Sequence, residues 1–344
     1  YLYKNVFTRF FFKNLYIFVI FPIYREIVLK EIGIDIEGVS KRFGKTIAVD
    51  NVSLKIYRGE LFSILGPNGA GKTTLMSMIV GIFPPDSGRI SILGMNISKD
   101  IDEIKKVIGY IPQENILYDK LTVYENMMFY AGLYDIPGSK AKEKVMKLLD
   151  FVGLKDSIKK RAKNLSGGMR KRLNIAIGLI NDPEILVLDE PTTGLDPNAR
   201  RNIWDLLRFL KKEGKTVIMA THYMEEADEL SDRVAIMDYG KIIALDAPDN
   251  LKKHFGPKTV LEISFYKSVS NMEEEFKNFS INGRIIMYND SLKLYVEDAD
   301  IVLPQIVEKS LKIGAKIKRI EIKEPTLEDV FIKLTGRRLD QHEV

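Results

Sequence analysis

Residues 61–74 have the sequence LFSILGPNGAGKTT, and this stretch decides the fold. The apolar run 61–65 predicts a buried strand, and the pattern G-x-x-x-x-G-K-[ST] follows it at Gly66–Thr73. Residues 73–82 predict a helix, which the turn-forming stretch 84–88 ends. A glycine loop between a strand and a helix is the context that makes this pattern a phosphate-binding loop and not an ordinary turn.

The residue types of the loop suit phosphate chemistry. Glycines let successive backbone N–H groups turn toward a phosphate where a side chain would clash, and the helix N-terminus adds a favourable dipole. Lys72 can place its charge on the β- and γ-phosphates, and the Thr73 hydroxyl can ligate Mg²⁺. The loop alone leaves many families of nucleotide hydrolases open.

A second apolar strand, 185–188, delivers two carboxylates to its end, Asp189 and Glu190. Ligands of open α/β sheets bind at the carboxyl ends of the strands. Asp189 would hold Mg²⁺ through water, and Glu190 would orient or deprotonate the water that attacks the γ-phosphate. The alternative is an acidic helix cap near Pro191.

The string Leu165-Ser166-Gly167-Gly168-Met169 precedes a helix whose apolar residues recur at helical spacing. It is a second anion-binding helix N-terminus in one domain. A domain with one phosphate loop has no evident use for a second one. Two copies packed head to tail would use both, because each copy would complete the ATP site of the other.

The order of elements predicts an α/β core and a smaller α+β unit. Strands alternate with helices up to about residue 250, which implies a mainly parallel sheet with helices on both faces, and a helical stretch at about 115–165 is an insertion in it. Beyond Gly256 the order is βαββαβ, the ferredoxin-like pattern, and a further helix begins at Thr326, where Asp329 completes a capping box. The expected strands of this unit are 259–265, 283–288, 291–298 and 316–323, and its expected helices are 268–279 and 301–313. We therefore expect an N-terminal extension (1–30), a nucleotide-binding domain (31–255) and a regulatory or dimer-stabilising C-terminal domain (256–344).

Composition and charge limit the kinds of metal site and partner that the chain can have. The chain has no cysteine, which excludes disulfides and thiolate metal sites. Its net charge is +5, but residues 1–30 hold five basic residues and one acidic residue, so the other 314 carry about +1. No basic cluster lies in the folded part, which argues against nucleic acid as a partner.

The N-terminal extension is unusual, because ten of its first 24 residues are aromatic. Its apolar run, 15–23, is half the length of a membrane span and contains Pro22. It would be an interfacial anchor or, the reading we favour, a segment that is not native to the protein. No other apolar run is long enough to span a bilayer, so membrane passage would come from a partner.

In their order and spacing, these motifs resemble the ABC ATPase family over roughly residues 34–250. The loop 66–73, the string 165–169 and the strand 185–190 are similar to its Walker A, signature and Walker B motifs. Further positions match its Q-loop (Gln113), its D-loop (Asp196), its switch histidine (His222) and the aromatic residue that stacks on adenine (Phe43).

The resemblance implies ATP and Mg²⁺ as cofactors and assigns roles to residues of this chain. The expected ATP-binding residues are Phe43, Gly66, Pro67, Asn68, Gly69, Ala70, Gly71, Lys72, Thr73, Thr74, Ser166, Gly167, Gly168 and Asp196. The expected catalytic residues are Glu190, His222, Gln113 and Lys72, and the expected Mg²⁺ ligands are Thr73, Gln113 and Asp189. The fold implied for the core is that of an ABC ATPase, with an antiparallel β-subdomain and a helical insertion.

The resemblance also implies a function. Segments 121–126, 221–227 and 324–331 look like those of bacterial and archaeal export ATPases. We therefore expect a peripheral subunit at the cytoplasmic face of the cell membrane, which couples ATP hydrolysis to a separate membrane-spanning permease and pairs with a second ATP-binding subunit. The permease would choose the substrate. The alternative is a soluble ABC-type ATPase that acts on nucleic acid or ribosomes.

Overall fold

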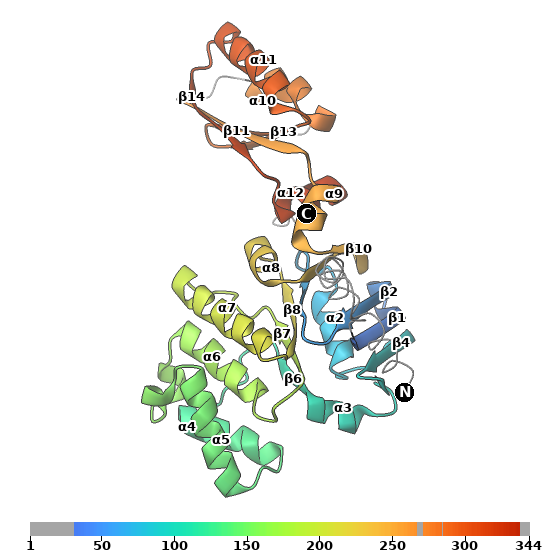
Figure 1. Ribbon diagram of the computed structural model, residues 1–344, viewed down its shortest axis with the longest axis vertical. Coiled ribbons are helices and arrows are strands. Elements are labelled where there is room, and N and C mark those ends of the chain that lie inside the picture. The colour runs from blue at the N-terminus through green and yellow to red at the C-terminus, as the bar shows by residue number, and fades with distance from the viewer. Residues whose placement is uncertain (1–30, 267–270, 284, 338–344) are drawn as a thin grey trace, which may run out of the picture.

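The computed structural model describes residues 31–266, 271–283 and 285–337. The predicted N-terminal extension, 1–30, lies outside the described residues. Figure 1 shows a large lower part that contains the phosphate loop and a smaller upper part formed by the C-terminal unit. Among the residues described, no helix is both long and apolar enough to cross a bilayer.

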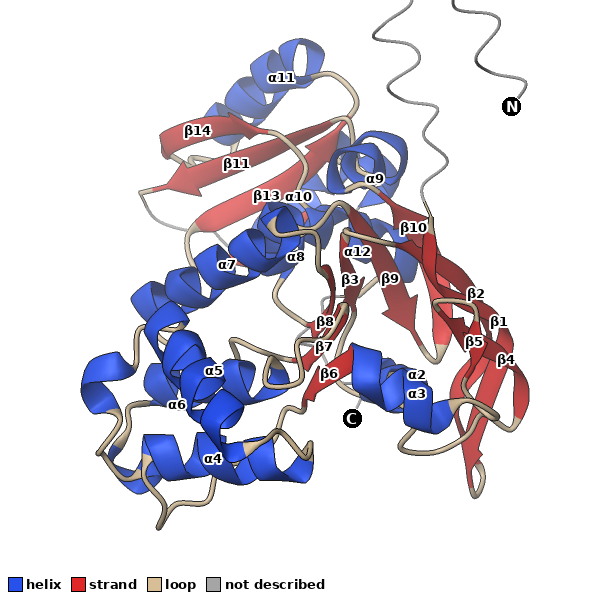
Figure 2. Ribbon diagram, turned by 60° about the horizontal axis from the view of Figure 1, so that its bottom comes forward, coloured by secondary structure: helices blue, strands red, loops and turns tan. Residues whose placement is uncertain are grey.

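The core of the large part is a six-stranded sheet with the order β10-β9-β3-β8-β7-β6. Five strands run parallel and only β10 is antiparallel to its neighbour, as the alternation of strands and helices predicts. Helices lie on both faces of this sheet (Figure 2). The strands are β3 (Leu61–Leu65), β6 (Ile108–Ile111), β7 (Ile185–Asp189), β8 (Thr216–Thr221), β9 (Arg233–Asp238) and β10 (Lys241–Asp246), and the helices around them are α2 (Lys72–Ile79), α3 (Ile101–Val107), α7 (Pro197–Lys212), α8 (Met224–Leu230) and α9 (Pro248–Phe255).

An antiparallel sheet flanks this core, with the order β2-β1-β4-β5. Its inward residues alternate with exposed ones, and the antiparallel β-subdomain implied by the family resemblance is confirmed. The strands are β1 (Ile32–Phe43), β2 (Thr46–Tyr57), β4 (Ser87–Ile92) and β5 (Met95–Asn96).

The predicted helical insertion forms a group of helices at the other end of the core (Figure 2). A full capping box between Thr122 and Glu125 fixes the start of the first of them. Asn126 is buried at its first turn, and its amide donates to three backbone carbonyls, which secures the loop that precedes the helix. The helices are α4 (Val123–Leu133), α5 (Gly138–Phe151) and α6 (Gly167–Gly178).

The C-terminal unit has the predicted ferredoxin-like topology. Its four-stranded antiparallel sheet has the order β12-β13-β11-β14, and its two main helices pack on one face through a core of their own. Of the predicted helix 268–279, residues 268–270 lie outside the described residues, 272–276 are α-helical and 277–279 form a 3₁₀ turn. The elements are β11 (Thr259–Phe265), α10 (Met272–Phe276), β12 (Ile285–Tyr288), β13 (Ser291–Val296), α11 (Ala299–Lys312) and β14 (Ile317–Lys323).

The last helix, α12 (Leu327–Thr335), returns to the large part and lies beside α9 (Figure 1). The predicted capping box of Thr326 and Asp329 begins it. Its fully buried Phe331 belongs to one apolar cluster with Ala227 of α8, Leu251 of α9 and Leu65, the residue before the phosphate loop. The C-terminal unit is thereby joined to the catalytic core by apolar packing as well as by the chain.

We predict that Phe331→Ala lowers the free energy of unfolding by about 3–5 kcal/mol, because a fully buried ring leaves a cavity between the two parts. The measurement is urea unfolding followed by circular dichroism. Tyr266→Ala is the matched control, since that ring is 63% exposed, and it should change the free energy by no more than about 0.5 kcal/mol. Equal effects of the two substitutions would contradict the packing described here.

Candidate functional site

Four segments distant in sequence meet at one edge of the central sheet. The phosphate loop follows β3, His222 follows β8, Glu190 follows β7 and Gln113 lies just beyond β6. These strands are neighbours and parallel, so their carboxyl ends lie together. The expected catalytic residues are therefore gathered at the edge where open α/β sheets bind their ligands.

The loop backbone has a shape that only glycine permits at two positions. Gly71 has φ 102°, and a Cβ there would lie 2.2 Å from the carbonyl oxygen of Ala48. A Cβ at Gly66 would lie 2.2 Å from the carbonyl oxygen of Met237. The two flanking segments hold the loop so closely that side chains are excluded, and its N–H groups begin α2.

Lys72 is the first residue of α2, and its ammonium turns back into the loop. Nζ donates to the carbonyl oxygens of Gly66 and Pro67, at 2.8 and 2.9 Å, and lies 3.9 Å from Oε1 of Glu190. Burial lowers the pKa of Lys72, and the carboxylates of Glu190 and Asp189 oppose that shift. A cation is thus held where the loop would cradle a phosphate.

Glu190 is the centre of the cluster. Its Oε1 lies 3.0 Å from Nδ1 of His222, and its Oε2 accepts from Thr193 Oγ1 at 2.8 Å and from Gln113 Nε2 at 3.3 Å. Burial raises the pKa of Glu190, but the bonds with His222 and Thr193 and the charge of Lys72 outweigh it and bring the pKa below its ordinary value. The carboxylate is therefore ionised at neutral pH.

The backbone of Glu190 is strained. It has φ 48°, in the left-handed region that non-glycine residues rarely adopt. A hydrogen bond from its N–H to the carbonyl oxygen of Ala220, at 2.9 Å, anchors it to β8. Such strain concentrates at functional sites, where the surroundings impose the conformation.

Asp189 fits the expected metal ligand. It is 1% exposed, and within the described residues neither carboxylate oxygen accepts a hydrogen bond of ordinary geometry. Burial raises the pKa of Asp189, and the neighbouring Thr73 hydroxyl opposes the shift. Mg²⁺ is bound in such sites by one or two carboxylates together with phosphate oxygens, so an orphaned carboxylate beside a hydroxyl suits it.

Lys171, on α6, also belongs to the cluster around Glu190, although no sequence motif predicted it. Its ammonium donates to the carbonyl oxygens of Glu190 and Gln113, at 3.2 and 3.3 Å. Burial lowers the pKa of Lys171, and Glu190 is foremost among the carboxylates that oppose the shift. The side chain joins the helix that follows the signature string to two of the catalytic segments. Spacing alone could not reveal this contact across the fold.

The signature string does not join this cluster. Ser166 is the exposed N-cap of α6 and accepts from Met169 N–H, and in the part of the chain described here no hydrogen bond or ion pair links residues 166–168 to the phosphate loop. Asp196 likewise is the exposed N-cap of α7, where it accepts from Ala199 N–H at 2.9 Å. Both expected ATP contacts are thus presented outward.

Phe43, at the end of β1, exposes half of its ring. Phe83 packs edge-on against it, with the ring centroids 5.5 Å apart, and Lys41 lies over both rings. Lys41 is held in turn by Asp86 at 2.8 Å. The stacking surface expected for adenine is accessible and supported from one side.

A buried carboxylate on α8, Glu226, ties the catalytic segments together. Its Oε1 accepts from Thr192 Oγ1 at 2.8 Å and from Trp204 Nε1 at 3.0 Å. Thr192 lies two residues after Glu190, and α8 begins two residues after His222. Burial raises the pKa of Glu226, and hydrogen bonding by Thr221, Thr192 and Trp204 opposes the shift. Sequence reasoning missed this residue because its stretch, EEADE, is typical of an exposed helix. The apolar residues Ala227 and Leu230, three positions apart, are the sequence signal that one face of this helix is buried.

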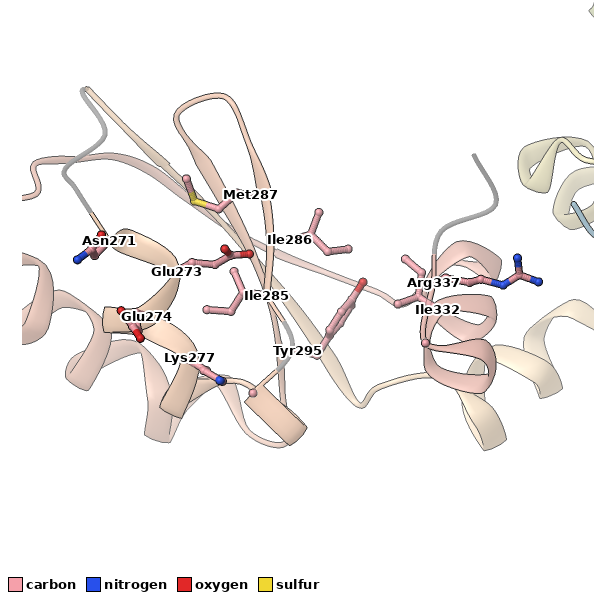
Figure 3. A pocket seen from close by; sticks show the side chains of 12 residues that line it. Asn271, Glu273, Glu274, Lys277, Ile285, Ile286, Met287, Tyr295, Ile332 and Arg337 are labelled. Carbon is pink, nitrogen blue, oxygen red and sulfur yellow. The ribbon is translucent and has the colours of Figure 1, made fainter. Parts of the chain in front are cut away.

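A cavity of about 740 Å³ lies in the C-terminal unit, between α10, β12 and α12 (Figure 3). Its walls carry Glu273 from α10, Lys277 from the 3₁₀ turn that follows α10, and Tyr295 from β13. None of the expected catalytic or ATP-binding residues lines it.

Comparison with known proteins agrees with this geometry. The family described as "ABC transporter" matches residues 49–193, and that described as "ATP-binding protein DrrA1-3-like, C-terminal domain" matches residues 247–335. Nod factor export ATP-binding protein I of Rhizobium sp. (strain N33) is 38% identical over 317 residues, which cover 91% of this chain and all of that protein. The chain belongs to the ATP-binding proteins of ABC transporters. The family resemblance of the motifs and the predicted ABC ATPase are confirmed.

Other members of the family support the assignment. Linearmycin resistance ATP-binding protein LnrL of Bacillus subtilis (strain 168) is 36% identical over 309 residues, 88% of this chain and 98% of that one. The structure of cbiO1 from Clostridium perfringens, part of the cbiONQ transporter complex, matches with a TM-score of 0.61 at 33% identity, over 65% of this chain and 92% of that one. An ATP-binding cassette in a post-hydrolysis dimer with ADP and phosphate matches with a TM-score of 0.57 at 28% identity, over 62% of this chain and 98% of that one. The predicted fold of this ABC ATPase is confirmed.

We predict that Glu226→Ala lowers kcat for ATP hydrolysis about tenfold. Loss of the Glu226 carboxylate should displace Glu190 or His222, and a displacement that raises the activation barrier by about 1.4 kcal/mol slows the reaction tenfold. The substitution also leaves Thr192 and Trp204 as unpaired buried donors, which costs about 2–5 kcal/mol of stability. Glu226→Gln keeps a hydrogen-bond acceptor and should retain most of the kcat and most of the stability. ATPase assays and urea unfolding measure the two effects. A Gln variant as impaired as the Ala variant would mean that the charge, and not the hydrogen bonds, matters.

Proposed function

We propose that this ABC ATPase hydrolyses ATP in a head-to-tail dimer and drives export through a separate membrane permease. The observation that carries the proposal is the single cluster of Glu190, His222, Gln113 and Lys72 at the end of the phosphate loop. The signature string, by contrast, faces outward. The chain thus has one half of an ATP site complete and the other half presented to a second copy.

The geometry supports a specific division of labour. Glu190, ionised because its pKa is low, accepts a proton from the attacking water or orients it. His222 and Gln113, both bonded to Glu190, set the direction of that carboxylate. In this proposal both side chains would also contact the γ-phosphate of bound ATP. Lys72 supplies positive charge against the charge that develops on the transferred group. In this proposal the attacking water is positioned by the side chain of Glu190, whose backbone is held by its hydrogen bond to Ala220.

We assign Mg²⁺ to Asp189, Thr73 and Gln113. The orphaned oxygens of Asp189 and the adjacent hydroxyl support this assignment. The bound ion would neutralise phosphate charge and polarise the γ-phosphate. Gln113 connects this position to the helical group, because the chain continues from it to α4.

The signature string of a second copy would complete the site. Ser166, Gly167 and Gly168 form the start of a helix of twelve residues whose N–H groups and dipole favour an anion. Asp196, at the start of α7, belongs to the same outward-facing surface in this proposal. A dimer bound to ADP and phosphate among the similar structures is consistent with two copies per working unit.

The permease would bind beside Gln113, on an exposed aromatic cluster. Tyr118 and Phe129 are exposed and lie 4.7 Å apart between ring centroids, with Tyr130 packed against both. Asn126 fixes the cluster, since its Oδ1 accepts from Tyr118 N–H at 2.8 Å. Together with Glu114 and Asn115, this cluster offers rigid apolar area next to a catalytic segment, which suits a cytoplasmic helix of a permease.

Export and a location at the cytoplasmic face of the cell membrane complete the proposal. The relatives from Rhizobium and Bacillus are named for Nod factor export and linearmycin resistance, and both are similar to this chain over nearly its whole length. The substrate would be selected by the permease. Nucleic acid is not proposed as a partner.

We predict that Glu190→Gln binds ATP, hydrolyses it at least about 10²-fold more slowly, and accumulates as an ATP-bound dimer, because general base catalysis contributes that much or more. Sedimentation with and without ATP measures the dimer. Glu190→Gln combined with Ser166→Trp is the matched control, since the bulky ring blocks the second half of the site. A Glu190→Gln variant that stays monomeric at saturating ATP would rule out the shared site.

We also predict that the chain co-purifies with a multi-span permease from detergent-solubilised membranes of its source cells. Phe129→Glu should abolish that recovery and leave ATP binding intact, because it places a charge in the apolar cluster. Tyr266→Glu is the control, since this exposed ring lies in the C-terminal unit. Recovery of ribosomes or nucleic acid in place of the permease would refute the proposed partner.

A further inference from the structure

Lys171 is the residue of the catalytic cluster to which the proposed division of labour gives no role. A lysine on a helix usually extends its ammonium into water or pairs it with a carboxylate. Lys171 is half-buried, and it forms no ion pair with any residue that the structure describes. Its ammonium donates to two backbone carbonyl oxygens instead, those of Glu190 and Gln113. Such a contact fixes two segments of backbone and neutralises no side chain.

The two carbonyl oxygens belong to residues whose side chains also meet. Nζ of Lys171 lies 3.2 Å from the oxygen of Glu190 and 3.3 Å from that of Gln113. Nε2 of Gln113 donates in turn to Oε2 of Glu190 at 3.3 Å. The three residues thus form a closed ring of hydrogen bonds, in which the segments that follow β6 and β7 are joined once through side chains and once through backbone.

The carbonyl group that Lys171 binds belongs to the strained residue of the site. Glu190 has φ 48°, and its N–H donates to the carbonyl oxygen of Ala220 at 2.9 Å. The N–H of Thr193 lies 3.5 Å from the Glu190 oxygen, which is too long for a strong bond. A left-handed conformation persists only where the surroundings impose it. Among the described residues, Lys171 is the side chain that imposes it from the carbonyl side.

The bonds of Lys171 differ from the side-chain bond in what happens to them when ATP and Mg²⁺ bind. In the proposed site Gln113 would turn its amide to the ion, and Glu190 would turn its carboxylate to the attacking water. Their mutual bond would then be lost. The bonds of Lys171 end on backbone oxygens, so rotation of either side chain leaves them in place.

We propose that Lys171 is a positioning residue for ATP hydrolysis. It holds the backbone of Glu190 in the conformation that directs the carboxylate at the attacking water. It also ties this backbone to the segment at Gln113, so a displacement of that segment moves Glu190 with it. Lys171 lies on α6, which begins at the signature string, so the ring is built on the helix that a second copy would contact. This inference rests on the proposed function in taking Glu190 as the residue that positions the water.

Replacement of the ammonium tests the role. Lys171→Met keeps the length of the side chain and removes its donors. It should lower kcat for ATP hydrolysis by about 10- to 100-fold, because a misplacement of a catalytic group by about 1 Å can cost about 10² in rate. KM for ATP should stay within about twofold, since neither bond of Lys171 is to an expected ATP-binding residue. Lys171→Ala, which lets water reach both oxygens, is a second variant with the same expected result.

Two further variants separate positioning from a general loss of stability. Lys171→Arg keeps a cation with donors for both oxygens and should retain at least about half of kcat. Arg170→Met is the matched control, since Arg170 on the same helix also donates to a backbone carbonyl, that of Ala162, outside the cluster. It should keep the kcat of the original chain. An unchanged kcat in Lys171→Met and Lys171→Ala, an arginine variant as slow as these two, or an equal loss in Arg170→Met overturns the proposal.

The ATP-bound dimer of Glu190→Gln distinguishes this inference from the proposed function. Lys171→Met added to Glu190→Gln should leave that dimer intact in sedimentation, because Lys171 is bonded to segments of its own chain. Loss of the dimer on this addition would place Lys171 in the contact between copies and refute the positioning role. A Glu190→Gln variant that is itself monomeric would refute the shared site, and the comparison of kcat values would still decide the role of Lys171.

Discussion

The parallel alignment of β3, β8 and β7 is the constraint on which the site depends. It sets Leu65 beside Thr221 and Asp189 beside Ala220, so the loop, the histidine and the two carboxylates all emerge at one level of the sheet. A shift by one residue would reverse the side chains of a strand and separate these groups. The sheet is buried on both faces, and this apolar burial stabilises the register that the polar chemistry requires.

The site concentrates features that oppose stability. Glu190 has a strained backbone, buried Asp189 receives no hydrogen bond of ordinary geometry from any residue that the structure describes, and burial disfavours the charge of Lys72. These costs are offset by contacts outside the reaction, among them Glu226 with Thr192 and Lys171 with the carbonyl oxygen of Glu190. Such a site is ready for a polyanion and a cation, because each would relieve a local excess of the opposite charge.

Most residues of the candidate site could be named from the sequence, because glycine spacing and apolar strands are local signals. Gln113 and His222 were placed in one site with Glu190 by the family resemblance, and no strand before Gln113 was predicted. The contacts of Lys171 and Glu226 were not predictable, because both join segments far apart in the chain and sit in charged stretches typical of exposed helices. The docking of α12 on α8 likewise depends on tertiary packing, which leaves no periodic signal of its own.

The docking of α12 gives the C-terminal unit a direct connection to the catalytic edge. Phe331 packs against α8, which carries Glu226 and begins just after His222. Arg337, past the end of α12, forms an ion pair with Asp238 at 2.6 Å, one residue beyond Met237, which confines the phosphate loop. A displacement of α12 would therefore disturb either α8, the helix that begins just after His222, or the segment at Met237 that confines the phosphate loop.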